Sequence, residues 1–167
     1  IFIRKDLESS KKIRAIVENV TDCKRGTTIG SNGVSIHTVE HLLSALYGLQ
    51  IDNAYIEIDN IEPPILDGSS KPFIEKILKS GIKEQSFKKK YIKILEPIEY
   101  HDEDSNIHIK VSPADDFSVT YNADFKNEVI GKQEYTLNSL IDYKNEIGFA
   151  RTFCTIDELE YLKNEKL

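Results

Sequence analysis

The stretch GVSIHTVEHLLSALYGL, residues 33–49, marks the change of the chain from a strand pattern to a helical one. Before it, apolar and polar residues alternate in short runs separated by glycines, which is typical of short strands joined by tight turns. Within it, apolar residues recur at helical spacing and predict a helix over residues 39–49. These residues are Val39, Leu42, Leu43, Leu46 and Leu49. We therefore expect a fold that combines sheets with helices.

Strands and helices continue to alternate downstream of this helix. The run AYIEIDN predicts a strand with Ile56 and Ile58 on one face and polar residues on the other. A turn at Asp67-Gly68 precedes a helix that begins at Pro72 and runs to Ile82. The remaining strands are predicted at residues 91–95, 98–100, 106–111, 117–125 and 148–153. The remaining helices are predicted at residues 137–146 and 156–167.

The order of these elements predicts an α+β protein made of two similar α+β domains, each with helices on one face of a sheet. The charged segment KEQSFKKK lacks periodicity and is the expected linker, which places the domains at residues 1–86 and 87–167. The chain has no methionine and begins inside a strand pattern. It ends in a helical pattern without a capping glycine. We expect it to be an internal piece of a longer protein, truncated at both ends.

Composition narrows the class of protein. Hydrophobic residues make up 40% of the 167 residues and charged residues 30%, as in soluble globular domains. The net charge of -6 argues against nucleic acid or an anionic membrane as the partner, because both require a basic surface. No apolar window is long enough to span a membrane. Cys23 and Cys154 lie far apart without a C-x-x-C spacing, which favours a reducing compartment and a cytoplasmic location.

The pentapeptide HTVEH, from His37 to His41, has the H-x-x-E-H form of a zinc-peptidase signature. If Ser35 caps the helix, both histidines fall within it and can hold a metal together. If Thr38 is the N-cap, His37 lies outside the helix and cannot share a face with His41. Glu40 then occupies the first turn, where the helix dipole favours a carboxylate. The residues alone also allow the plain interpretation that the histidine and the glutamate only cap or pack.

The two other histidines do not supply an evident third ligand. His101 lies in the acidic segment HDEDSN, which is predicted to be a turn. His108 lies on one face of the strand predicted for NIHIKV. Because neither belongs to a recognisable ligand motif, a peptidase-type zinc site is the weaker interpretation.

Several motifs together resemble the family of UDP-3-O-acyl-N-acetylglucosamine deacetylase, the zinc enzyme of the committed step of lipid A biosynthesis in Gram-negative bacteria. The resemblance is carried by RGTTIGSNGVSIHTVEH, AYIEID, EPPILDGSSKPF, FSVTYNADF and ARTFCTIDELEYL, and it covers essentially the whole chain. It implies two α+β domains whose helices pack between two sheets. It also implies a UDP-linked acylated N-acetylglucosamine as the substrate.

The resemblance implies a zinc centre at the start of the helix. His41 matches one of three zinc ligands, and Glu40 matches the general base that activates the zinc-bound water. His37 stands where the family usually has a small or polar residue, so it is not expected to be a ligand. The family's other two ligands come from an H-x-x-x-D motif and its general acid is a later histidine, and neither occurs in this chain. We therefore expect the chain alone to bind zinc weakly and not to turn over substrate.

Substrate contacts are implied at two other motifs. Thr152, in ARTF, is similar to the threonine that stabilises the tetrahedral oxyanion, and Phe153 beside it would line the substrate site. Phe125, in NADF, is similar to the aromatic residue that stacks on the uracil ring, with Asp124 next to it. Taken alone, these residues are equally consistent with a strand-end hydroxyl and core aromatics.

The FCTIDELE version of the last motif is closer to the Bacteroidetes branch of the family. In that branch the deacetylase is often fused to a 3-hydroxyacyl-carrier-protein dehydratase, which is therefore an expected fused or associated partner. The alternative function is a non-catalytic homologue that binds a nucleotide sugar without hydrolysing it.

Overall fold

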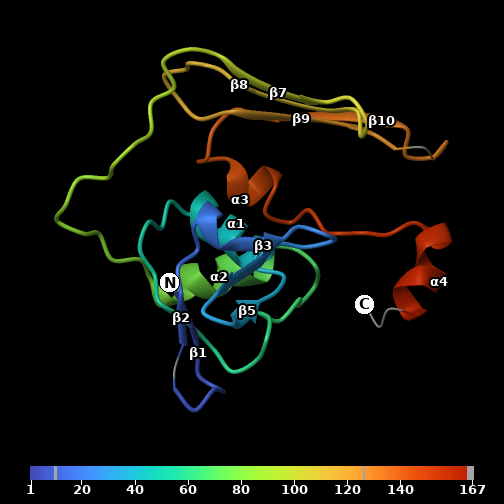
Figure 1. Ribbon diagram of the computed structural model, residues 1–167. Coiled ribbons are helices and arrows are strands. Elements are labelled where there is room, and N and C mark those ends of the chain that lie inside the picture. Colours follow the sequence, from blue (N-terminus) through green and yellow to red (C-terminus); the bar gives the residue numbers. More distant parts are fainter. Residues whose placement is uncertain (10, 126, 165–167) are drawn as a thin grey trace. The chain divides into compact units, whose positions relative to one another are not determined.

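The computed structural model describes residues 1–9, 11–125 and 127–164. These residues form two compact units (Figure 1). The first unit combines Ile1–Ile82 with Ile141–Leu167, and the second comprises Lys83–Leu140. The second unit therefore begins with the charged segment that was expected to be a linker.

The first unit contains two three-stranded sheets. The first sheet has the strand order β2-β1-β6, and its central strand β1 pairs antiparallel with β2 and parallel with β6. The second sheet has the strand order β3-β4-β5, and both pairs of neighbouring strands are antiparallel. The strands are β1 (Phe2–Arg4), β2 (Lys11–Ile13), β3 (Val20–Asp22), β4 (Thr28–Ser31), β5 (Val34–Ile36) and β6 (Ile56–Ile58). A 3-10 turn, η1 (Val17–Asn19), precedes β3. The short strands predicted at the start of the chain are thus confirmed.

Four helices complete the first unit. They are α1 (Glu40–Gly48), α2 (Lys71–Ser80), α3 (Tyr143–Glu146) and α4 (Ile156–Asn164). Helix α2 carries Pro72 in its first turn, where the missing amide removes no helical hydrogen bond. It ends at Gly81, whose φ of 84° suits glycine and stops the helix.

The core of the first unit joins both sheets to the start of α1. Phe2 and Ile13 come from one sheet, Ile29 and Ile36 come from the other, and Val39 directly precedes α1. Each of these five side chains is at most 1% exposed. Partly buried side chains pack against them, including Leu42, Leu43, Ile56 and Ile58. Because each large apolar side chain contributes about 1.5–3 kcal/mol on burial, this cluster holds the first turn of α1 firmly in place.

The other end of α1 is fitted closely to α3. A Cβ atom on Gly48 would lie 2.0 Å from Cδ1 of Tyr143, so glycine is the residue that this approach allows. Tyr143 is buried, and its hydroxyl is hydrogen-bonded to Oγ of Ser44 in α1. The single helical turn of α3 is therefore a packing element rather than an independent helix.

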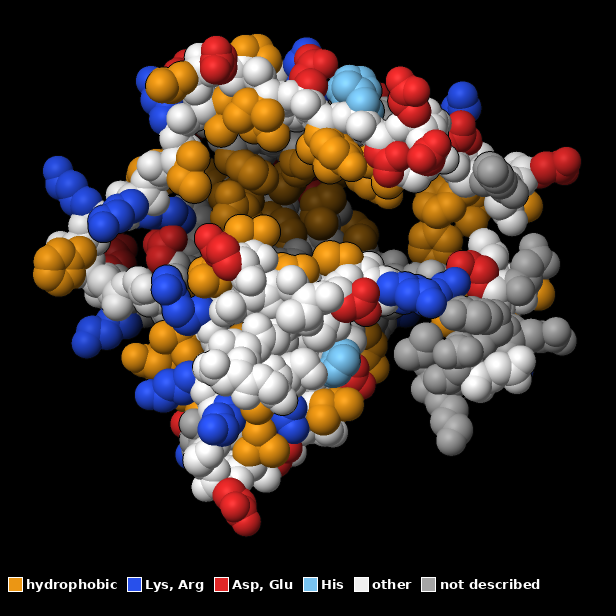
Figure 2. Space-filling view, in the orientation of Figure 1, with side chains coloured by type: hydrophobic (Ala, Val, Ile, Leu, Met, Phe, Trp, Pro, Cys, Tyr) orange, Lys and Arg blue, Asp and Glu red, His pale blue; other side chains and the backbone are white. Residues whose placement is uncertain are grey.

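The second unit consists of two antiparallel hairpins. They are formed by β7 (Ile98–Asp102) with β8 (Ile107–Val111), and by β9 (Val119–Asp124) with β10 (Lys132–Leu137). Asp102 closes the first turn, because its carboxylate accepts hydrogen bonds from the amide of Asp104 and the hydroxyl of Ser105. Figure 2 shows hydrophobic side chains gathered over these strands. The exposed ones are Ile98, Tyr100, Ile107, Ile109, Val111, Val119, Tyr121 and Tyr135.

Three sequence-based predictions about the described residues are wrong, and one strand was not predicted. Residues 91–95 form no strand, and the side chains of Tyr91 and Ile92 are exposed. The helix predicted from Leu137 begins only at Tyr143, because Leu137 pairs with Val119 as the last residue of β10. Strand β10 itself was not predicted, and residues 148–153 form no strand.

The α+β class is confirmed, since helices and several small sheets alternate along the chain. The division into two similar domains at residues 1–86 and 87–167 stays a prediction. Among the described residues, no helix is both long enough and apolar enough to cross a membrane.

Candidate functional site

The carboxylate of Glu40 is anchored at the start of α1. Glu40 is the first residue of the helix, where the free amides and the helix dipole favour a negative charge. Its Oε2 accepts a hydrogen bond of 2.8 Å from the backbone amide of Thr27. A Cβ atom on Gly26 would lie 3.3 Å from Oε1, so a small residue leaves room for the carboxylate. The backbone therefore holds Oε2 of Glu40, and Oε1 is the oxygen that can accept a proton.

The imidazole of His41 lies next to this carboxylate. Its Nε2 is 3.9 Å from Oε1 of Glu40, and the His41 side chain is 17% exposed. The backbone of His41 is held separately, because the hydroxyl of the buried Ser70 donates a hydrogen bond of 2.9 Å to its carbonyl oxygen. An accessible imidazole nitrogen beside a carboxylate oxygen is a pair that can share a metal ion and a water molecule.

The prediction that Thr38 caps α1 is wrong. Val39 occupies the N-cap position without a side-chain cap, and Thr38 has a φ of 53°. The hydroxyl of Thr38 donates instead to Oε2 of Glu62, at 3.0 Å. The consequence drawn from that prediction is nevertheless confirmed, because His37 lies outside the helix.

His37 has its own polar neighbours away from His41. Its Nδ1 lies 3.2 Å from Oγ1 of Thr28, and its Nε2 lies 3.3 Å from Oγ of Ser35. Among the described residues, His37 and His41 do not occur together in any group of three candidate metal ligands. The arrangement therefore gives no support to a two-histidine peptidase clamp.

The loop ILDGSS joins the start of α1 to the ARTF segment. Gly68, with a φ of 79°, presents its carbonyl oxygen to the amide of Thr152 at 2.9 Å. Asp67 accepts hydrogen bonds from the amide and the hydroxyl of Ser69, at 3.0 and 2.7 Å. These bonds, with Arg151 nearby at 3.5 Å, hold the pKa of the Asp67 carboxyl below its usual value. The loop is thus rigid, and it carries Ser70 to His41 and Gly68 to Thr152.

The substrate-contact candidates fall in both units. Thr152 and Phe153 are exposed in the first unit, and Phe153 is 59% exposed. In the second unit, Asp124 ends β9 and its Oδ2 lies 3.5 Å from Nζ of Lys132. The amide of Phe125 donates a hydrogen bond of 3.0 Å to the carbonyl oxygen of Gly131. The structure brings Glu40, His41 and Thr152 into one unit, and it describes Asp124 and Phe125 within the other.

Two supporting residues were missed by sequence reasoning. Thr27 and Ser70 act on the site through a backbone amide and a hydroxyl, and neither has a residue type that by itself signals chemistry. Both lie inside motifs that carry the family resemblance, RGTTIG and DGSS. Membership of these motifs was the only feature of the sequence that could have pointed to them. The placement of His101 in a turn is also wrong, because His101 lies in β7 opposite His108 of β8.

The donor set at the start of α1 fits part of a zinc site. Glu40 and His41 offer one carboxylate and one imidazole, whereas catalytic zinc sites usually have three protein ligands. Within the described ranges, the one cluster of three histidine, cysteine or acidic donors lies elsewhere, on β7 and β8. Glu40 and His41 by themselves therefore offer fewer donors than a catalytic zinc site requires.

Comparison with known proteins identifies the family of this chain. Residues 1–167 match the model of the family described as LpxC, UDP-3-O-acyl N-acetylglycosamine deacetylase. The chain belongs to this family. It is 45% identical over 166 residues to the bifunctional enzyme LpxC/FabZ of Chlorobaculum tepidum, covering 99% of this chain and 36% of that protein.

Other members of the LpxC family are similarly related. The chain is 40% identical over 168 residues to the UDP-3-O-acyl-N-acetylglucosamine deacetylase of Syntrophus aciditrophicus, covering 100% of this chain and 53% of that protein. It is 39% identical over 159 residues to the bifunctional LpxC/FabZ enzyme of Bacteroides thetaiotaomicron, covering 95% of this chain and 34% of that protein. The chain thus spans between about a third and a half of these relatives.

Proposed function

We propose that this protein is a zinc-dependent hydrolase that removes the N-acetyl group of UDP-3-O-acyl-N-acetylglucosamine in the biosynthesis of lipid A. The observation that carries the proposal is the pair formed by Glu40 and His41, in a chain that matches the deacetylase family along its whole length. The names of the relatives support the same reaction, since they include UDP-3-O-acyl-N-acetylglucosamine deacetylases.

His41 would supply one ligand of the zinc ion through Nε2. The other protein ligands would come from the part of the relatives that these residues do not span. Zinc supplies a Lewis acid that polarises a carbonyl group and makes water easier to deprotonate. The role of this chain would be to position His41, whose backbone carbonyl oxygen accepts a hydrogen bond from the Ser70 hydroxyl.

Glu40 would act as the general base. Because Thr27 holds Oε2, the carboxylate presents Oε1 toward His41, and this oxygen is placed to take a proton from an attacking water. Thr152 would donate its hydroxyl hydrogen to the oxyanion that forms on the acetyl carbonyl. Its backbone is held by Gly68, so the hydroxyl approaches the reaction from a fixed main chain.

Substrate recognition would use aromatic and acidic side chains. Phe125 would stack on the uracil ring with Asp124 beside it, and Phe153 would line the substrate site. Three further properties belong to the same proposal: a cytoplasmic location, a Gram-negative source, and a fused or associated 3-hydroxyacyl-carrier-protein dehydratase. The dehydratase is supported by the relatives that are named as bifunctional LpxC/FabZ enzymes.

Two substitutions in the full-length protein test the assignment. Glu40→Gln should keep zinc and lower kcat/KM by about 10²- to 10⁴-fold, because it removes the base and keeps the side-chain shape. His41→Ala should lose zinc together with activity. Glu57→Gln is the matched control, since Glu57 is 61% exposed on β6 and pairs only loosely with Lys5. A Glu40→Gln enzyme with the wild-type kcat/KM would refute the assignment of the base.

The second candidate is a homologue that binds a nucleotide sugar without hydrolysing it. It is favoured by one observation, the incomplete set of zinc ligands around His41 in the described residues. Titration of the full-length protein with UDP and a separate measurement of acetate release distinguish the two functions. Binding of UDP without any acetate release, in protein loaded with zinc, would favour the binding homologue.

A further inference from the structure

The hairpin of β7 and β8 has two chemically different faces. Alternate residues place Ile98, Tyr100, Ile107, Ile109 and Val111 on one face. The other face carries Glu99 and His101 from β7, and His108 and Lys110 from β8. Register pairs Glu99 with Lys110 and His101 with His108. The polar face therefore brings two imidazoles and a carboxylate together without using any side chain of the apolar face.

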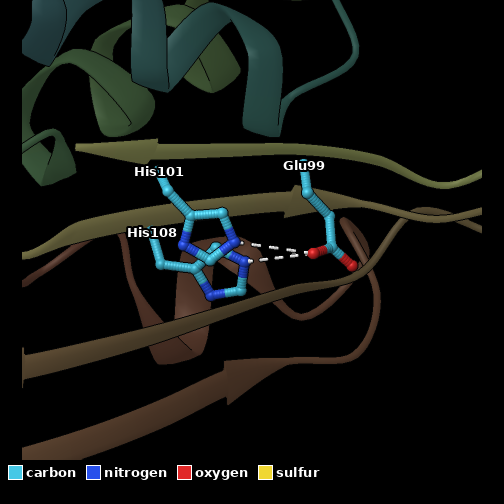
Figure 3. A group of neighbouring side chains, drawn as sticks. All are labelled: Glu99, His101 and His108. Carbon is cyan, nitrogen blue, oxygen red and sulfur yellow. Dashed lines mark ion pairs between the residues drawn. The ribbon is translucent and has the colours of Figure 1, made fainter. Parts of the chain in front are cut away.

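The three side chains converge at one point (Figure 3). Nε2 of His101 lies 3.6 Å from Oε2 of Glu99, and Nε2 of His108 lies 3.8 Å from the same oxygen. The two imidazole rings are stacked, with centroids 4.1 Å apart and planes inclined by 9°. One donor atom from each residue lies within 4.8 Å of the other two. These separations are close to those between neighbouring ligands of one metal ion.

We propose that Glu99, His101 and His108 bind a divalent transition-metal ion, independently of His41. Two imidazoles and one carboxylate are nitrogen and oxygen donors of the kind that nickel, copper and zinc prefer. Lys110 holds the other oxygen of Glu99 at 2.7 Å, so the carboxylate is fixed in position while Oε2 faces the histidines. Three protein ligands leave the remaining coordination positions to water.

Binding of a metal ion requires the two imidazole rings to rotate, and their exposure to solvent leaves room for this movement. Nearly parallel rings direct their Nε2 lone pairs along similar lines, so the rings must rotate apart before both can face one ion. The side chains of His101, His108 and Glu99 are 60%, 49% and 42% exposed, which leaves room for this rotation. The bound ion would bridge β7 and β8 and should stabilise the hairpin by linkage.

Calorimetric titration of the full chain with Ni²⁺ tests the proposal. The wild type should show a binding event that is lost in His101→Gln/His108→Gln. In Glu99→Gln the affinity should fall by about tenfold or more, because one of three ligands is gone. The event should persist in His37→Ala and in His41→Ala, which separates it from the candidate site on α1.

A matched control and a second measurement complete the experiment. Glu103→Gln removes the same charge from the neighbouring turn and should leave Ni²⁺ binding unchanged. Ni²⁺ should raise the unfolding temperature of the wild type and not that of His101→Gln/His108→Gln, whose fold is checked by circular dichroism. Absence of Ni²⁺ binding in the wild type, binding that survives in the double variant, or binding lost in His41→Ala would each overturn the proposal.

Discussion

The backbone amide of Thr152 donates a hydrogen bond of 2.9 Å to the carbonyl oxygen of Gly68. This bond joins two motifs that lie far apart in the sequence, ILDGSS and ARTF. Two residues further along the same loop, Ser70 binds the backbone of His41. The loop therefore couples the backbone of the candidate oxyanion donor to that of the candidate zinc ligand.

Substitution of Gly68 by alanine should damage both stability and function. Gly68 has a φ of 79°, which costs an alanine about 1–2 kcal/mol. Any relaxation of that strain moves the carbonyl that holds Thr152, so kcat/KM of the full-length protein should fall by about tenfold or more. Denaturant unfolding and steady-state kinetics measure the two effects.

Gly33→Ala is the control for this prediction. Gly33 has a φ of 75° and no atom within 4 Å of an added Cβ, so it shares the strain and lacks the contact with Thr152. It should lose similar stability and keep kcat/KM. Equal losses of kcat/KM in both variants would contradict a specific role of Gly68.

Ser70→Ala should remove a hydrogen bond that holds the backbone of His41. The Ser70 side chain is buried, and its hydroxyl donates to the His41 carbonyl oxygen at 2.9 Å. Loss of this hydrogen bond should lower the free energy of unfolding by about 0.5–1.5 kcal/mol. Zinc affinity of the full-length protein, measured by competition with a chelator, should fall as well. Ser80→Ala is the control, because Ser80 is exposed and bonds only within its own helix, and it should leave zinc affinity unchanged.

Gly48→Ala should destabilise the chain although alanine favours helices. The added Cβ would lie 2.0 Å from the Tyr143 ring, and such overpacking costs about 1–3 kcal/mol. In a Tyr143→Ala background, which removes the whole ring, the same substitution should cost much less. A double-mutant cycle by denaturant unfolding measures the difference, and strictly additive effects would show that the two residues do not interact.

Asp6 should contribute stability near neutral pH that is lost in acid. The hydrogen bonds from the Arg4 guanidinium, at 2.8 and 2.5 Å, lower the pKa of the Asp6 carboxyl. The ionised carboxylate therefore contributes stability above its unfolded-state pKa of about 3.9, and that contribution is lost as the pH falls through the lowered folded-state value. Wild-type protein should be more stable than Asp6→Asn near neutral pH. The gap should narrow below about pH 4, and a gap that stays constant in acid would contradict this role.

The spacing of apolar residues predicted those helices and strands whose own sequence shows the periodicity of the element. Helix α1 and the alternation of Ile56 with Glu57 in β6 followed from spacing alone. Strand β10 could not be predicted, because KQEYTL has a polar pattern and becomes a strand by pairing with β9. Residues 91–95 show the reverse case, since their alternating apolar residues form no strand.

The candidate site was predictable to a similar extent. The adjacency of Glu40 and His41 is present in the sequence, whereas the position of His37 depended on which residue caps the helix, and the sequence left Ser35 and Thr38 as alternatives. The amide of Thr27 was hidden, because a backbone donor has no residue signature and approaches Glu40 only through the packing of β4 against α1. The pairing of His101 with His108 was hidden for a related reason, since it depends on the register of β7 with β8.

Both main-chain groups of Thr27 form hydrogen bonds at the start of α1. Its amide holds Oε2 of Glu40, and its carbonyl oxygen accepts a hydrogen bond of 3.2 Å from the amide of Val39. Neither contact involves the threonine side chain. An alanine in place of Thr27 would therefore keep both hydrogen bonds, and an alanine scan would not reveal the role of this position. Proline is the exception, because it alone lacks the amide that aims the carboxylate.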